Sequence, residues 1–483
     1  MGYAPNAYGE PTQVGSYATN ASYYANGIVR GYDTPNWLTL WQTLDAQQRL
    51  KKREVHGGGN HVVELSYTYD ANHNIQSIID GVNGTHSVTG LSYDGLDRLV
   101  AATGHWGQGS FSYDSNGNIV TRQLGSASDT YHYDSAKRLT HISGSTARNF
   151  SYDNRGNVIS NGQRSFSFNR AGQISGSGGI SYRYDGHGRR VAKTISGSTT
   201  YSYYSQDGQL LGTYADGDYT DYYYLGREMV ARYSDSTQSD APGYTGHVED
   251  DDLGLVYMQQ RYYDANIGRF YSNDPIGFRD IHSFNRYAYA NNNPYKYIDP
   301  SGMCSNAPGT DANDVCQSAS NLNISQKGID HIKKSENDTG NLSVQDDGLG
   351  NPTAGYGHKV TPQDNLKMND PISQSKADSL LAQDIAIAEG VVENLVGSLP
   401  VSQNEFDALT DLAFNVGAGK LSPQNSPGLN AAIKAGDYEG MSNNLKYTRG
   451  VNKQGQSLSL PGLATRSAER RTIFRGNIQY KNP

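Results

Sequence analysis

Three residues in the last third of the 483-residue chain have side chains and a spacing suited to acid–base chemistry. Glu336 is followed by Asp347 after 11 residues and by Thr353 after a further 6. We expect Glu336 to lie at a helix end against apolar residues, where burial raises the pKa of a carboxyl group and keeps it protonated as a general acid. Asp347 belongs to a polar turn and should stay ionised, and the Thr353 hydroxyl could orient a water molecule. Two carboxyl groups in such unequal surroundings, on either side of a cleft, are the usual apparatus of glycoside hydrolysis.

The residues around Glu336 predict the elements that would hold these side chains. Ser325 is a suitable N-cap for a helix in which Ile329, Ile332 and Glu336 lie on one face. The glycine-rich polar segment 346–360 (DDGLGNPTAGYGHKV) suits a small hairpin sheet. The pattern therefore predicts a helix end next to a hairpin, with the acid on the helix and the other two residues on the hairpin.

Two capping boxes predict the helices that follow. Ser375 with Asp378 precedes one apolar stripe, and Ser402 with Glu405 precedes another. A capping box satisfies two N–H groups at the start of a helix, so it marks a helix start in the sequence. Together these signals predict a mainly helical α+β domain of about 160 residues, long enough for a hydrophobic core of its own.

The segment 347–358 (DGLGNPTAGYGH) closely resembles the catalytic hairpin of phage-type lysozymes, with their Glu…Asp…Thr triad and TxGxGH signature. Downstream, residues 408–421 (ALTDLAFNVGAGKL) resemble the central helix of that family, and residues 461–474 (PGLATRSAERRTIF) resemble its closing helical segment. The resemblance covers about residues 323–477. It departs from the family in one respect, because Glu336 and the aspartate are slightly farther apart in sequence than usual.

This resemblance implies cleavage of the β-1,4 bond between N-acetylmuramic acid and N-acetylglucosamine in peptidoglycan. Glu336 would protonate the leaving oxygen, Asp347 would activate or electrostatically assist water, and Thr353 would position that water. The resemblance also places Tyr356 and His358 at the substrate-binding surface. For His358 taken by itself, a structural hydrogen-bonding role is favoured over an acid or base role.

The first 302 residues are built differently, from a repeated β-hairpin element. Only four of the 37 tyrosines lie beyond residue 302. The element is an aromatic residue followed by Asp, then turn residues often ending in Gly, then a polar and an aliphatic residue. Its clearer copies begin at Tyr93, Tyr113, Tyr133, Tyr152, Phe168 and Tyr184, and weaker copies begin at Leu44, Tyr69 and Tyr204.

From Tyr93 to Tyr204 the intervals between copies are 20, 20, 19, 16, 16 and 20 residues. A period of this size predicts one β-hairpin per repeat, with neighbouring hairpins joined in a continuous sheet. The aspartate should cap N–H groups of the turn, and Gly or Asn should tolerate its positive φ. We expect the tyrosine rings to pack while their hydroxyl groups remain in water.

The repeat resembles the YD-repeat, or rearrangement-hotspot (Rhs), family over roughly residues 28–302. The stretch from Tyr244 (YTGHVEDDDLGLVYMQQRYYDANIGRFYSNDPIGF, then NRYAYANNNPYKYIDPSGM) resembles the Rhs-associated core domain. In that family the strands form a hollow shell that encloses a C-terminal toxin. The resemblances together predict a multidomain chain with an all-β N-terminal sheet or shell and a mainly α, lysozyme-like C-terminal domain. The expected parts are repeats at 1–243, the core at 244–303, a linker at 304–322 and the lysozyme-like domain at 323–483.

The Rhs resemblance further implies that the core cuts its own chain after the second of two DPxG motifs. The first motif starts at Asp274 and the second is 299–303 (DPSGM), with scission after Met303. Two carboxyl groups brought close can share one proton, so that one of Asp274 and Asp299 would act as base toward water and the other as acid toward the carbonyl. Arg261, from the segment RYYD, could hold one of them ionised.

Composition and charge argue against several classes of function. The net charge is −8 and no long basic run is present, which argues against nucleic acid as the main partner. No apolar run reaches the roughly 18 residues that a membrane-spanning helix needs, and the first residues lack the pattern of a signal peptide. The 12 histidines lack metal-ligand spacing, so we expect neither a metal nor a cofactor. Cys304 and Cys316 either form a disulfide in an oxidising compartment or are two free thiols.

The favoured hypothesis is an Rhs-type effector with a β-sheet carrier, a self-cleaving core and a lysozyme-like toxin. The resemblance implies peptidoglycan strands as substrate, a cognate immunity protein, and delivery by a type VI or related secretion machine. The chain would be made in the cytoplasm and act in the periplasm or cell wall of a target bacterium. One alternative is a wall-associated YD-repeat protein whose last domain binds glycan without cutting it. In another, the core is the only enzyme and the tail is passive cargo.

Overall fold

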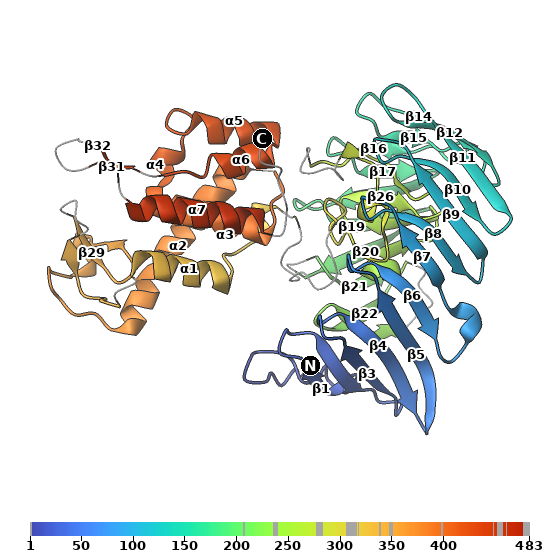
Figure 1. The fold of residues 1–483 in the computed structure, drawn as a ribbon, viewed down its shortest axis with the longest axis horizontal. Coiled ribbons are helices and arrows are strands. Elements are labelled where there is room, and N and C mark those ends of the chain that lie inside the picture. The colour runs from blue at the N-terminus through green and yellow to red at the C-terminus, as the bar shows by residue number, and fades with distance from the viewer. Residues whose placement is uncertain are drawn as a thin grey trace. The chain divides into compact units, whose positions relative to one another are not determined.

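The computed structural model divides the chain into two compact units, Met1–Asp274 with Phe284–Thr310 and Pro275–Ser283 with Asp311–Pro483. It describes residues 2–205, 208–234, 240–276, 284–305, 316, 318–337, 340–346, 351–397, 399–447, 449–451, 457–459 and 461–476. The first unit is built of strands and the second mainly of helices (Figure 1). This confirms the predicted fold class. Most of the predicted linker, residues 306–315 and 317, lies outside the described residues. Both cysteines are disulfide-bonded.

The first unit contains a succession of antiparallel hairpins that follow one another in chain order (Figure 1). A six-stranded sheet comprises β1 (Thr19–Tyr23), β2 (Val29–Asp33), β3 (Thr39–Leu44), β4 (Leu50–Gly57), β5 (Asn60–Tyr69) and β6 (Ile75–Asp80). A seven-stranded sheet comprises β7 (Thr89–Tyr93), β8 (Leu99–Gly104), β9 (Gly107–Tyr113), β10 (Ile119–Leu124), β11 (Ala127–Tyr133), β12 (Leu139–Gly144) and β13 (Arg148–Asn149).

The remaining repeats form a two-stranded and an eight-stranded sheet. The two strands are β14 (Ser151–Tyr152) and β15 (Val158–Ser160). The eight strands are β16 (Ser167–Phe168), β17 (Ile174–Ser177), β18 (Ile180–Tyr184), β19 (Arg190–Ile195), β20 (Ser198–Tyr204), β21 (Leu210–Ala215), β22 (Asp218–Leu225) and β23 (Glu228–Ser234). Consecutive strands pair within each sheet, which confirms the prediction of one hairpin per repeat. The expectation of one continuous sheet is wrong, because strand pairing is interrupted between β6 and β7, between β13 and β14, and between β15 and β16.

The repeat aspartates close the turns as predicted. Asp134 Oδ1 accepts a hydrogen bond from Arg138 N at 2.9 Å, and Asp134 Oδ2 accepts one from Arg138 Nε at 2.8 Å. The residue before the arginine, Lys137, has φ +63°, and glycine takes the equivalent place at Gly156 with φ +84°. The same double contact is made by Asp45 with Arg49, Asp94 with Arg98, and Asp185 with Arg189.

The repeat tyrosines tie each hairpin to the one before it. Tyr133 Oη donates to Ile119 O at 2.7 Å, and burial raises the pKa of this hydroxyl. The same bond joins Tyr69 to Leu50, Tyr93 to Ile75, Tyr113 to Leu99, Tyr152 to Leu139, Tyr184 to Ile174, Tyr204 to Arg190 and Tyr224 to Leu210. The expectation that these hydroxyl groups remain in water is therefore wrong, because a carbonyl of the preceding repeat takes the place of water.

A buried four-stranded sheet packs against the repeats. It consists of β24 (Val248–Asp250), β25 (Leu255–Met258), β26 (Arg261–Asp264) and β27 (Arg269–Phe270). Tyr131, on β11, donates to Ile267 O at 3.2 Å, and Arg148, on β13, pairs with Asp264 at 2.9 Å. From the later repeats, Tyr184 Oη lies 3.5 Å from Tyr262 Oη. The core sheet therefore contacts both early and late repeats.

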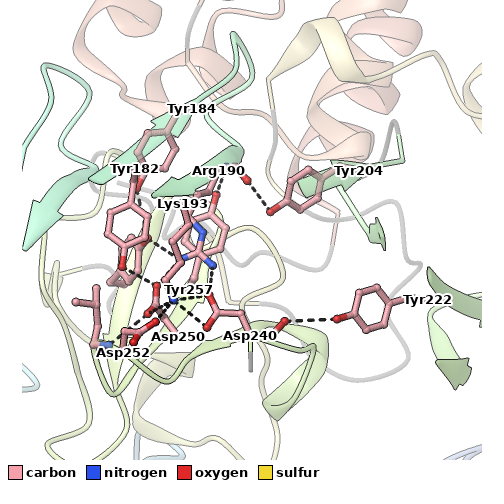
Figure 2. A network of polar contacts seen from close by, with 12 residues as sticks. Tyr182, Tyr184, Arg190, Lys193, Tyr204, Tyr222, Asp240, Asp250, Asp252 and Tyr257 are labelled. Carbon is pink, nitrogen blue, oxygen red and sulfur yellow. Dashed lines mark hydrogen bonds and ion pairs between the residues drawn. The ribbon is translucent and has the colours of Figure 1, made fainter. Parts of the chain in front are cut away.

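Buried charges hold β24 to β19 (Figure 2). Lys193 Nζ lies 2.8 Å from Asp240 Oδ2, 3.1 Å from Asp250 Oδ1 and 2.6 Å from Asp252 Oδ2. Arg190 pairs with Asp240 and Asp250 as well, and Figure 2 shows both cations directed at this acidic group. Burial raises the pKa of Asp240, whereas the two cations outweigh burial and lower the pKa of Asp250. The oxygens of the three acids lie within 4.8 Å of one another, as in a metal site, but the lysine ammonium lies among them.

The second unit is helical, with a small sheet between its first two helices. The helices are α1 (Gln326–Glu336), α2 (Gln374–Val396), α3 (Gln403–Val416), α4 (Ala418–Leu421), α5 (Pro427–Ala435), α6 (Tyr438–Asn443) and α7 (Pro461–Arg475). The small sheet contains β28 (Gln345–Asp346), β29 (Pro352–Ala354) and β30 (His358–Lys359), and β31 (Arg449–Val451) pairs with β32 (Ser457–Ser459). None of the helices in the described ranges is long and apolar enough to cross a membrane.

Two of the three predicted helix starts are confirmed. Ser325 caps α1, and Ser402 with Glu405 forms the capping box of α3. The third is wrong, because Ser373 caps α2 by accepting from Lys376 N at 3.2 Å, so the helix begins before Ser375.

Removing one repeat hydroxyl tests its contribution to the β unit. We expect Tyr133→Phe to lower the free energy of unfolding by about 1 kcal/mol, because the Ile119 carbonyl loses this donor. The matched control is Tyr219→Phe, since the Tyr219 side chain is 55% exposed and should contribute much less. Urea unfolding followed by near-ultraviolet circular dichroism measures both. Equal losses of stability in the two variants would contradict a role for the hydroxyl.

Candidate active sites

Glu336 is the last residue of α1, and its carboxylate is paired with a cation from α7. Arg466 Nη1 donates to Glu336 Oε1. The Glu336 side chain is 20% exposed, and that of Arg466 is 6% exposed. The expectation of purely apolar surroundings for this carboxyl group is therefore wrong, because a buried guanidinium lies against one of its two oxygens.

Arg466 is itself oriented by a buried aspartate of α3. Its Nε and Nη2 atoms lie 3.0 and 2.6 Å from Asp411 Oδ1, and Arg470 Nε lies 2.6 Å from Asp411 Oδ2. Burial opposes ionisation of Asp411, but the cations of Arg466 and Arg470 outweigh it and hold the pKa of Asp411 below its usual range. Breaking a buried ion pair leaves an uncompensated charge, which is costly. The pairs therefore fix the direction from which Arg466 reaches Glu336.

The turn between β29 and β30 lies directly against Glu336. A Cβ atom added at Gly357 would lie 2.9 Å from Glu336 Oε2, and Gly357 has φ +86°. Asn337, just beyond the helix, donates from Nδ2 to Gly355 O at 3.3 Å. Glycine is therefore required at position 357 both for the backbone conformation and for the close approach. The predicted arrangement of a helix end next to a hairpin is confirmed.

Thr353, the third residue of the predicted triad, belongs to this hairpin. Thr353 is half-buried on β29, where it is opposite Gln345 and Lys359 in the sheet. Its Oγ1 donates to Gln345 O at 3.4 Å. Asp347 lies outside the described residues, so the structure places two of the three side chains.

Tyr356 packs the hairpin onto the helices. Its Oη accepts a hydrogen bond from Gln374 Nε2 at 2.9 Å, and Lys333 Nζ lies 5.2 Å from its ring centre. The ring packs against a cluster that includes Ile332 of α1. Tyr356 thus links α1, α2 and the hairpin.

His358 lies between two carboxylates. Its Nδ1 is 2.9 Å from Asp384 Oδ2, and its Nε2 is 3.3 Å from Asp364 Oδ2. Hydrogen bonds from the Thr361 side chain and N–H lower the pKa of Asp364 to about 2. At neutral pH His358 therefore faces at least one ionised carboxylate. These contacts are those of a structural hydrogen-bonding residue.

In the β unit, the two motif aspartates meet at one arginine. Arg261 begins β26 and is buried. Its Nη2 lies 2.8 Å from Asp274 Oδ2 and 3.1 Å from Asp299 Oδ2. Because one nitrogen contacts both carboxylates, the two acids are neighbours. We expected Arg261 to hold one of these acids, and it pairs with both. The end of the first motif, residues 277–278, lies outside the described residues.

Asp299 is buried beside the peptide bond at which scission is expected. Its Oδ1 accepts hydrogen bonds from Met303 N at 2.9 Å and from Cys304 N at 3.0 Å. Burial raises the pKa of Asp299 against the opposing effects of the Arg261 cation and these N–H groups. His247 Nε2 lies 2.9 Å from Asp299 O, and burial lowers the pKa of His247 to about 4, so the neutral ring donates to that carbonyl. A carboxyl group shifted toward its protonated form therefore lies 3.0 Å from the nitrogen that scission would release.

Four residues of these sites were not identified from the sequence, namely Asp411, Arg466, Arg470 and His247. Asp411 interrupts the apolar residues of α3, and Arg466 and Arg470 are spaced i, i+4 on α7, where they lie on one helix face. An acid between the apolar residues Leu409 and Leu412 together with two aligned arginines is a signal that could have predicted the pairing. His247 carries no such signal, because its partner is a backbone carbonyl 52 residues away.

Comparisons with known proteins match the two parts of the chain separately. The phage lysozyme family model matches residues 336–470, and the Teneurin YD-shell model matches residues 3–207. The tRNA3(Ser)-specific nuclease WapA of Bacillus spizizenii is 29% identical over an alignment of 284 residues, and the match covers 52% of this chain and 11% of that protein. The chain thus spans about a tenth of the length of this relative.

The matches of the C-terminal part include endolysins. The endolysin of Acyrthosiphon pisum secondary endosymbiont phage 1 is 30% identical over 153 residues, which are 32% of this chain and 98% of the endolysin. Among solved structures, the endolysin from Escherichia coli O157:H7 phage FAHEc1 is 27% identical, covers 33% of this chain and 98% of its own, and has a TM-score of 0.29. The chain therefore joins a YD-shell part at residues 3–207 to a C-terminal domain that belongs to the phage lysozyme family.

Proposed function

We propose that the C-terminal domain hydrolyses the β-1,4 bond between N-acetylmuramic acid and N-acetylglucosamine in peptidoglycan. The observation that carries this proposal is the Glu336 carboxylate, which Arg466 holds at Oε1 while Oε2 faces the hairpin turn at Gly357. A guanidinium only donates, so the proton of the acid form resides on Oε2. Glu336 would give this proton to the glycosidic oxygen as the leaving sugar departs.

The hairpin would supply the rest of the chemistry. Asp347 would activate or electrostatically assist a water molecule, and Thr353 would position that water against the sugar. Tyr356 and His358 would support the glycan-binding surface from the same hairpin. The proposed steps use only these side chains and water.

Replacing the acid separates catalysis from binding. We expect Glu336→Gln to reduce the hydrolysis of purified peptidoglycan by about a thousandfold, because the amide cannot protonate the leaving oxygen. The matched control is Glu393→Gln, at an exposed position of α2, which should retain full activity. Release of soluble fragments measures hydrolysis, and cosedimentation with intact peptidoglycan measures binding. If the unaltered domain binds peptidoglycan without releasing fragments, the last domain is a glycan-binding module and the enzymatic proposal fails.

We also propose that the core hydrolyses the peptide bond between Met303 and Cys304. Asp274, ionised beside Arg261, would take a proton from water as the water oxygen attacks the Met303 carbonyl carbon. Asp299 would donate its proton to the Cys304 nitrogen as the C–N bond breaks. The products are a carboxylate on Met303 and a free amine on Cys304. The support for this step is the position of Asp299, 3.0 Å from the departing nitrogen.

The protonation of Asp299 makes self-cleavage depend on pH. Because burial raises the pKa of Asp299, its acid form is populated at higher pH than that of an ordinary aspartate and is lost as the pH rises through that raised value. We expect cleavage of freshly synthesised full chain to be faster at pH 5 than at pH 8, with the rate falling up to about tenfold per pH unit above the pKa. Gel analysis of a time course checks this. Asp299→Asn should leave the chain intact at every pH, and an unchanged band pattern in that variant would refute the assignment.

We propose, finally, that the chain acts as an antibacterial effector. Its match to the YD-shell model and its lysozyme-family domain support this role. The proposed parts are repeats at 1–243, the core at 244–303, a linker at 304–322 and the enzyme at 323–483, so that the cut after Met303 releases linker and enzyme together. Made in the cytoplasm, the chain would be delivered by a type VI or related secretion machine to the cell wall of a target bacterium. The producing cell would carry a cognate immunity protein.

A further inference from the structure

The core segment contacts the turns of the repeats one after another. Its side chains donate to backbone carbonyl groups of turns in the copies that begin at Tyr69, Tyr113, Tyr152, Tyr184 and Tyr204. These bonds join Lys296 to Asn72 O (2.8 Å), Asn285 to Gly117 O (2.7 Å), Asn273 to Arg155 O (2.8 Å), Tyr287 to Gly156 O (2.7 Å), Gln260 to His187 O (3.0 Å) and Gln259 to Gly208 O (3.2 Å). Two of these donors, Gln259 and Gln260, form the turn that immediately precedes Arg261.

The same turn also holds the segment that leads to the proposed cut. Three donors pair with three successive carbonyl groups: Gln259 Nε2 with Pro300 O (3.3 Å), Gln260 N with Ser301 O (3.2 Å) and Arg261 Nε with Gly302 O. A Cβ atom on Gly302 would overlap the Met258 carbonyl oxygen, so the segment lies directly on this turn. The next carbonyl along the chain is that of Met303, the one that water would attack.

One amide group therefore connects a repeat to the scissile segment. Gln259 Nε2 lies between Gly208 O and Pro300 O, and the Gln259 backbone has φ +54°, a conformation that is costly for a residue other than glycine. Such a conformation persists only where surrounding contacts hold it. The carbonyl groups of His187 and Gly208 are among those contacts.

We infer that Gln259 and Gln260 are positioning residues that make self-cleavage depend on docking of the repeat turns that carry His187 and Gly208. The inference rests on the proposed cleavage after Met303. When these turns are docked, the glutamines hold the scissile segment against Arg261 and Asp299. Before docking, the segment is not held there and the peptide bond stays intact. The enzyme is thus released only after the last repeats have packed on the core.

Variants of Gln259 test the donor. We expect Gln259→Met, which keeps the length but cannot donate, to slow self-cleavage of the full chain by at least about fivefold. Gln259→Lys, which can donate to the same carbonyl groups, should recover much of the rate. The matched control is Gln209→Ala, because Gln209 Nε2 donates to another turn glycine, Gly226 O at 2.9 Å, but is not one of the donors to the scissile segment. A urea midpoint equal to that of the unaltered chain shows that folding is unaffected.

Variants of the repeats test docking from the other side. At Gly208, with φ +87°, an added Cβ would lie 2.8 Å from Gln259 Nε2. At Gly217, with φ +100°, an added Cβ would meet nothing within 4 Å. Both Gly→Ala variants carry backbone strain, but we expect only Gly208→Ala to slow the cut, although position 208 is about 95 residues from the scissile bond.

The outcomes separate this inference from the proposal on which it rests. If Asp299→Asn blocks cleavage while Gln259→Met and Gly208→Ala cleave at the unaltered rate, the coupling is refuted and the cleavage chemistry stands. If Asp299→Asn cleaves normally, or the unaltered chain is never cut, both are refuted. If Gln259→Met and Gly217→Ala are slowed equally, general destabilisation explains the loss and the coupling is again refuted.

Discussion

A buried guanidinium shared by two carboxylates is the interaction on which both candidate sites depend. In the β unit Arg261 joins Asp274 and Asp299, and in the helical unit Arg466 joins Glu336 and Asp411. A buried cation must be paired, and the planar fork of a guanidinium fixes the direction of each partner. Each arginine therefore brings together acids that lie far apart in the sequence. The result differs in the two units. Arg261 holds two acids together, of which Asp299 lies beside a peptide bond, whereas Arg466 orients one acid toward a hairpin.

The repeats supply the framework that makes the first of these sites possible. The hydroxyl groups of the repeat tyrosines bond to the preceding repeat, and several turns offer carbonyl groups to the core segment. A single hydrogen bond of this kind contributes only about 1 kcal/mol, so the core is held by many repeats acting together. Charge adds to this at one place, where Lys193 and Arg190 pair with Asp240 and Asp250 (Figure 2).

Local patterns in the sequence predicted the helices and strands well. They did not predict contacts between residues that are far apart in the sequence. The YD period predicted the hairpins and the role of Asp134, and Ser325 and Ser402 marked their helices, because each signal acts within a few residues. The start of α2 was misplaced because two serines, Ser373 and Ser375, compete at the same helix end.

At the candidate sites, too, the sequence identified single residues but not their distant partners. Glu336 and the DPxG aspartates could be named from the sequence, but the cations that hold them depend on folding. Arg466 is 130 residues from Glu336, and no local pattern says that these two side chains meet. The tyrosine hydroxyl groups were misjudged for the same reason, since their partners belong to the preceding repeat. Distant partners of this kind decide the surroundings of a carboxyl group, and hence its chemistry.

We propose that the C-terminal domain is a muramidase, and the chemical identity of the sugar ends that it creates tests this proposal most directly. Mass spectrometry of borohydride-reduced fragments from digested peptidoglycan identifies the residue whose C1 was released. The account predicts that every new reducing end is N-acetylmuramic acid. New reducing ends of N-acetylglucosamine, or fragments that differ only by cut peptides, would contradict it.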